Sequence, residues 1–117
     1  MADPVAMERP GATVLAAIRD SILFENEDLL IVNKPQGIAV HGGTGQRIGV
    51  IEALRWLRTE EGTDTFLELA HRIDKETSGC LVICKNAKVL KLVQEAFKAR
   101  RVTKIYLALV HGRWPRG

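Results

Sequence analysis

The sequence has few residues able to form cross-links or metal centres. Its 117 residues include two cysteines, Cys80 and Cys84. In an extended segment their Cα atoms would lie about 13 Å apart, whereas a disulfide needs less than about 7 Å. The histidines, His41, His71 and His111, are scattered, and a structural zinc site needs about four ligands. We therefore expect free thiols, which suit a reducing compartment, and no metal centre.

Long apolar runs are also missing. No stretch approaches the roughly 18 apolar residues of a membrane span. Residues 1–6, MADPVA, lack the basic and apolar regions of a signal peptide. The glycine-rich residues 42–45 are not followed by the Gly-Lys-Ser/Thr of a phosphate-binding loop, and a flexible surface loop is the simplest interpretation. These features predict a cytoplasmic protein without a membrane anchor.

Composition and charge fit one small globular domain. Apolar residues make up 46% of the chain, which is ordinary for a domain with a core. The net charge is +3, and Lys98, Arg100, Arg101 and Lys104 form a basic cluster at the end of an expected helix. Two interpretations of this cluster stand: it complements the helix dipole, or it binds nucleic acid.

Hydrophobic periodicity and turn signals predict an α+β fold with a mixed, largely antiparallel sheet and two helices. Residues 1–20 look like a leader or linker ending in a short amphipathic piece. The expected strands are residues 22–25, 29–33, 68–74, 80–85 and 103–110, and the expected helices are residues 48–60 and 87–100.

The most informative stretch is residues 71–79, HRIDKETSG, which lies between two apolar segments. In an extended segment Arg72 and Asp74 share one face. A nearby positive charge favours the ionised form of a carboxylate, which can then act as a nucleophile or general base. A structural ion pair above a turn is the alternative interpretation.

Residues 71–79 resemble the catalytic motif of the pseudouridine synthase family that modifies structured RNA, with Ile73 in place of the usual Leu. Residues 22–35, 37–43 and 104–110 resemble other blocks of that family in the same order. The sequence of residues 33–43, NKPQGIAVHGG, is similar to the corresponding sequence of one subgroup of the family, which acts on the large ribosomal subunit.

The resemblance implies a set of site residues. Asp74 would be the catalytic carboxylate, and Arg72 would orient it or fill the space left by a flipped base. Tyr106 would stack on the base and move protons, although a half-buried strand aromatic also fits its pattern. The residues expected to contact RNA are Lys34, His41, Arg100, Arg101 and Lys104.

The implied reaction is isomerisation of specific uridines to pseudouridine in large-subunit ribosomal RNA, without a cofactor. The resemblance leaves open which uridines are targets, and whether Asp74 attacks C1′, adds to the pyrimidine or abstracts a sugar proton. A non-catalytic RNA-binding module is the alternative function. Residues 21–117 resemble only the N-terminal half of the family's catalytic domain. We therefore expect this chain alone to be inactive and to self-associate through unpaired sheet edges.

Overall fold

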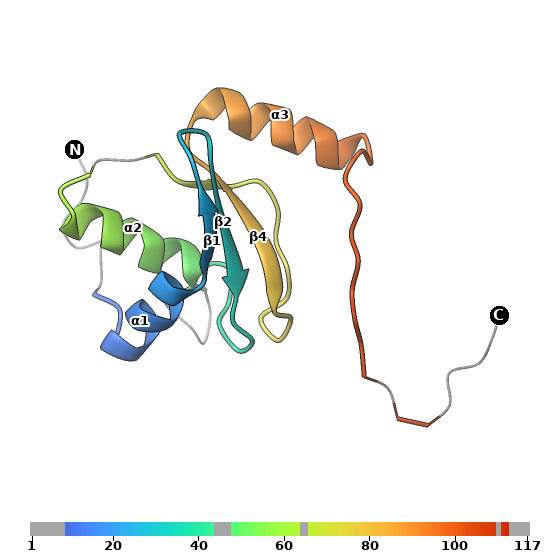
Figure 1. Cartoon of the computed structure of the whole chain (residues 1–117), viewed down its shortest axis with the longest axis horizontal. Helices are drawn as coiled ribbons and strands as arrows, with labels where there is room; N and C mark the ends of the chain where they lie inside the picture. The colour runs from blue at the N-terminus through green and yellow to red at the C-terminus, as the bar shows by residue number, and fades with distance from the viewer. Residues whose placement is uncertain (1–8, 44–47, 64–65, 110, 113–117) are drawn as a thin grey trace.

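The computed structural model describes residues 9–43, 48–63, 66–109 and 111–112, which form an α+β unit with an extended C-terminal segment (Figure 1). No helix in these ranges is long and apolar enough to cross a membrane. The elements, in chain order, are α1 (Ala12–Asp20), β1 (Ile22–Glu25), β2 (Leu29–Lys34), α2 (Val50–Glu60), β3 (Glu68–Leu69), β4 (Gly79–Cys84) and α3 (Ala87–Lys98).

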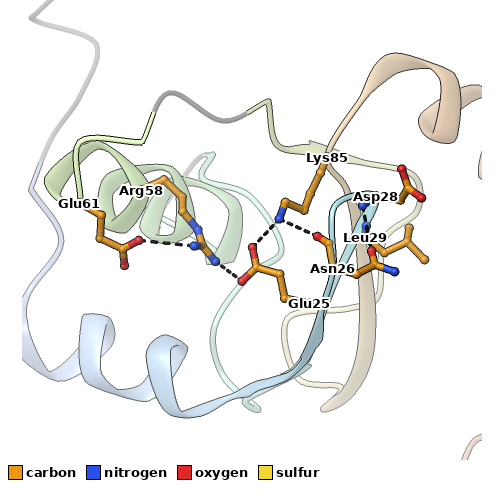
Figure 2. Close-up of polar contacts among 7 residues, drawn as sticks. All are labelled: Glu25, Asn26, Asp28, Leu29, Arg58, Glu61 and Lys85. Carbon is orange, nitrogen blue, oxygen red and sulfur yellow. Dashed lines mark hydrogen bonds and ion pairs between the residues drawn. The ribbon is translucent and has the colours of Figure 1, made fainter.

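The sheet has the strand order β1-β2-β4-β3, and all neighbouring strands run antiparallel. The chain reverses between β1 and β2 at Asn26, whose Oδ1 accepts the backbone N–H groups of Asp28 and Leu29 (Figure 2). In the central pair Leu30 is opposite Ile83. This pairing brings the end of β2 beside the start of β4, where the site residues gather.

The core lies between the sheet and the two helices α1 and α2 (Figure 1). Alternate residues of β2 and β4 point into it, because successive side chains of a strand face opposite sides. The helices contribute apolar residues at spacings of three and four. The fully or almost fully buried members include Leu15, Ile18, Leu30, Val32, Val50, Ile51, Leu54, Leu81 and Ile83.

An ion-pair network joins the β1–β2 turn to α2 and β4. The Glu25 carboxylate accepts from Arg58 of α2 on one oxygen and from Lys85 on the other (Figure 2). Arg58 also pairs with Glu61, 3.4 Å away, and Lys85 donates to the carbonyl of Asn26. Burial acts to raise the pKa of Glu25, but the hydrogen bonds and charges of Lys85 and Arg58 lower it below its ordinary value.

Helix α3 has well-formed ends but no buried residue. Asn86 caps its start by accepting the Val89 N–H at 2.9 Å. Its C-terminus has the hydrogen bonds of a Schellman motif, from the N–H of Arg100 to the Phe97 carbonyl and from Arg101 to Ala96. Arg100 therefore has a φ of 57°, in the left-handed region that favours glycine.

The α+β class and the antiparallel pairing are confirmed, but three details of the sequence prediction are wrong. Three helices are present among the described residues instead of two, because the amphipathic piece expected at the end of residues 1–20 forms α1 and buries Leu15 and Ile18. Residues 1–8 of the expected leader or linker lie outside the described residues. Strand pairing after α2 is limited to Glu68–Leu69 instead of residues 68–74.

The third correction concerns residues 103–110. Residues 103–109 form no strand, and Val110 lies outside the described residues. The segment runs away from the sheet (Figure 1), so no neighbouring strand satisfies its backbone groups. Its apolar side chains are correspondingly exposed, with Leu107 at 98% and Leu109 at 103%.

Candidate active site

Asp74 opens a tight turn in the loop between β3 and β4. The N–H of Thr77 donates to the Asp74 carbonyl at 3.0 Å, which closes the turn. The Asp74 side chain is exposed, and its carboxylate has no hydrogen bond or ion pair within the described part of the chain. Arg72 is also exposed, and the ion pair between Arg72 and Asp74 is not formed there. The carboxylate is therefore open to a substrate.

The backbone of this turn is held by Lys34, the last residue of β2. Lys34 is fully buried, and its Nζ donates to the carbonyls of Pro35 at 2.9 Å, Ile38 at 2.7 Å and Lys75 at 2.9 Å. The Lys75 carbonyl also accepts the Gly37 N–H at 2.8 Å. One ammonium and one amide thus tie the Asp74 turn to the loop after β2.

Lys34 also sets the local charge. Burial lowers its pKa, while the negative charges of Glu76 and Asp74 oppose that shift. A lysine has three N–H donors, and all three are used by backbone carbonyls. The expectation that Lys34 contacts RNA is therefore wrong for this structure. The residue supports the turn from inside.

The loop that contains His41 is fastened to the start of α2. One oxygen of Glu52 accepts the N–H groups of Gly42 at 2.8 Å and Gly49 at 2.7 Å. Gly49 allows this approach, since a Cβ there would lie 2.6 Å from the carbonyl oxygen of Ala39. The His41 Nδ1 lies 2.8 Å from the Gly42 carbonyl, so that nitrogen donates. The His41 ring is half-buried within this loop.

After Lys34, a second residue that holds the segment around Asp74 is His71, three residues before Asp74; we call its contacts the His71 anchor. Its Nε2 accepts the N–H of Val82 in β4 at 3.0 Å. The ring stacks on Phe97 of α3, with 4.6 Å between ring centroids and 24° between planes. The Lys104 Nζ lies 5.3 Å from the centre of the same Phe97 ring. The sequence did not predict this role of His71, and its position within the motif was the one signal that pointed to it.

The other expected site residues are not assembled with Asp74. Arg100 and Arg101 are exposed just beyond α3, at the end of the helix where the basic cluster was expected. Lys104 reaches the Phe97–His71 stack. Tyr106 is 61% exposed in the segment that runs away from the sheet (Figure 1). The structure thus brings together the Asp74 turn, Lys34 and the His71 anchor, but leaves Tyr106 apart.

Comparisons with known proteins match this region. A family model described as RNA pseudouridylate synthase matches residues 28–116. Ribosomal large subunit pseudouridine synthase C of Haemophilus influenzae is 53% identical over 100 residues, covering 86% of this chain and 30% of that protein. The protein of the same name from Escherichia coli K12 is 47% identical over 105 residues, covering 90% of this chain and 32% of that protein. These matches confirm the resemblance to the subgroup that acts on the large ribosomal subunit.

A solved structure shares the fold. Human RNA Pseudouridylate Synthase Domain Containing 4 superposes with a TM-score of 0.63 at 32% identity, over 76% of this chain and 33% of that one. The chain spans about a third of the length of the relatives that it matches, between 30% and 35% in the curated proteins. The residues matched by the family model, 28–116, include the Asp74 turn, Lys34 and His71.

Proposed function

The chain belongs to the RNA pseudouridylate synthase family, and from this premise we propose that it supplies the catalytic carboxylate of a uridine isomerase. The substrate would be specific uridines of large-subunit ribosomal RNA, since the matched relatives are named for that RNA. The protein would work in the cytoplasm, where ribosomal RNA is available to it, and would need no cofactor.

The observation that supports this proposal best is the contrast between Asp74 and its surroundings. The carboxylate is exposed and unpaired within the described residues, whereas the backbone beside it is fixed by the buried Lys34. A reactive group needs this combination, because misplacing it by about 1 Å can cost about 100-fold in rate. A purely structural aspartate would be expected to have a partner.

The proposed reaction centres on a positioned carboxylate. The bond from the base nitrogen N1 to C1′ breaks, a bond from the base carbon C5 to C1′ forms, C5 loses its proton and N1 gains one, so no redox group or group donor is required. The target uridine must leave the helical stack, which costs a few kcal/mol. An exposed carboxylate on a turn can contact a flipped nucleotide. The exposed Arg72 would orient the Asp74 carboxylate or occupy the space that the flipped base leaves in the RNA.

RNA contacts would come from exposed or half-exposed groups on other elements. His41 lies at the rim of the loop after β2, and Arg100 and Arg101 follow α3. Lys104 lies over Phe97, beside the His71 anchor. Lys34 has no such role here, since its ammonium is enclosed.

Tyr106 is the reason to expect that these 117 residues alone do not catalyse the reaction. It would stack on the base or move protons only if its segment lay beside Asp74, and residues 103–109 are instead extended and exposed. We propose that these residues act within a longer protein, as part of a catalytic domain. In isolation, the unpaired segment would favour self-association, because unsatisfied backbone groups pair with other chains.

An assay of tritium release from 5-tritiated uridine in ribosomal RNA separates this proposal from a non-catalytic RNA-binding module. We expect the full-length protein that contains these residues to release one tritium for each target uridine, with each protein molecule acting many times. Tight RNA binding without release would favour the module instead.

A further inference from the structure

We propose that His71 is a positioning residue for Asp74, and that only its neutral ring can hold the Asp74 loop on β4. The inference rests on the proposed function, because it assigns a role in placing the catalytic carboxylate. This role is supported by the direction of the hydrogen bond between His71 and Val82 and by the stacking of Phe97 on the His71 ring.

The direction of the bond to β4 is fixed by chemistry. The Val82 backbone N–H can only donate, so the His71 Nε2, 3.0 Å away, must accept with a free lone pair. The proton of the neutral ring then lies on Nδ1. A protonated ring carries hydrogen on both nitrogens and would present an N–H to the N–H of Val82. Protonation therefore removes this bond and replaces it with repulsion.

The bond matters because it holds the start of the loop that carries Asp74, where the other described attachment is Ile73, which packs against the core. Pairing between β3 and β4 ends at Leu69, opposite Ile83. Beyond that point His71 continues the connection to β4, and Lys75 is next held by Lys34 and Gly37. Asp74 lies between these two anchors. Losing the His71 anchor would free one end of the segment that carries the carboxylate.

The groups around the ring favour the neutral form. Phe97 of α3 stacks on it and Val82 of β4 faces its Nε2, and neither side chain titrates. Lys104, from the segment after α3, is the charged group that acts on the ring, while Arg72 and Asp74 on its own loop are exposed. Burial, and then the Lys104 charge, lower the pKa of His71 below 6.5. The anchor is thus intact above pH 6.5 and is lost as the pH falls through the lowered pKa.

The test compares His71→Gln and His71→Phe in the full-length protein that contains these residues. The glutamine oxygen can accept the Val82 N–H and does not titrate, whereas phenylalanine keeps the stacking on Phe97 but cannot accept. At pH 7.5 we expect His71→Phe to lower kcat about tenfold or more with little change in KM, and His71→Gln to restore most of it. In the wild type, kcat should also fall as the pH drops below 6.5. This acid limb of the pH profile should be missing in His71→Gln.

Lys104→Met gives an independent check, since removing the charge should move this limb toward higher pH. A full kcat in His71→Phe, or the same acid limb in wild type and His71→Gln, would overturn the inference. Either result would leave the proposed function intact, because the wild type would still be active. A full-length protein that releases no tritium at any pH would overturn the proposed function and the positioning role together.

Discussion

The ammonium of Lys34 lies 2.9 Å from the carbonyl oxygen of Lys75, although 41 residues separate them in the chain. The contact joins the end of β2 to the turn that Asp74 opens. Because Lys34 is buried and its three donors are used, the turn is supported from within the protein. The exposed carboxylate and the buried ammonium thus belong to one structural unit.

Replacing Lys34 with Met should destabilise the full-length protein and lower kcat. Three backbone carbonyls would lose a charged donor, and hydrogen bonds to charged groups contribute about 1.5–3 kcal/mol. Urea unfolding measures the loss. Lys75→Met is the matched control, because its backbone carbonyl remains and its side chain is exposed. Equal stability of the two variants would contradict this account of Lys34.

Glu52→Ala should loosen the loop that contains His41. Its carboxylate serves two backbone N–H groups, those of Gly42 and Gly49, and loss of a helix cap costs about 0.5–2 kcal/mol. Hydrogen exchange of residues 38–43 should accelerate. Glu60→Ala, an exposed position at the other end of α2, should leave that exchange unchanged. Similar exchange in both variants would show that Glu52 does not hold the loop.

The Glu25 network should make stability depend on pH in acid. The pKa of Glu25 is lowered in the folded state, so its ionised form contributes stability above the ordinary value of 4.5. That contribution is lost as the pH falls through the lowered pKa. Glu25→Gln should therefore be less stable than wild type at pH 7, and the difference should shrink at pH 3. Thermal unfolding at the two pH values tests this, and a constant difference would refute it.

Arg100→Gly should stabilise the fold while weakening RNA binding. Glycine relieves the left-handed backbone, which costs other residues about 1–2 kcal/mol. The lost charge should reduce the salt dependence of binding. Arg101→Gly removes the same charge without that backbone gain. If both variants change stability alike, the strain at Arg100 is not a factor; if binding keeps its full salt slope, Arg100 lies away from the RNA.

Much of the sheet and two helices follow from the sequence because their signals are local. Apolar runs bounded by turn residues mark β2 and β4, and Asn86 marks the start of α3. The motif around Asp74 is visible as a pattern of residue types. The error at residues 103–110 has a physical cause: alternation predicts a strand only if a neighbour pairs with it. The sequence of one strand does not reveal its partner.

The supporting contacts of the site are less visible in the sequence. A lysine at residue 34, within the family-like stretch of residues 33–43, looks like an RNA contact. Its burial depends on carbonyls contributed by residues 35, 38 and 75, and the last is distant in the chain. The bond between His71 and Val82 likewise depends on the path of the loop over β4. Such long-range contacts have no local sequence signal.

The claim that Asp74 is the catalytic carboxylate is tested by comparing two variants with the wild type. Tritium release from 5-tritiated uridine in ribosomal RNA would be measured for the full-length wild type, Asp74→Asn and Glu76→Gln. Both variants remove one exposed carboxylate from the same turn, so they match in charge and position. We predict that Asp74→Asn folds and binds RNA but releases no tritium, whereas Glu76→Gln remains active. Turnover by Asp74→Asn above a tenth of the wild-type rate would contradict the claim.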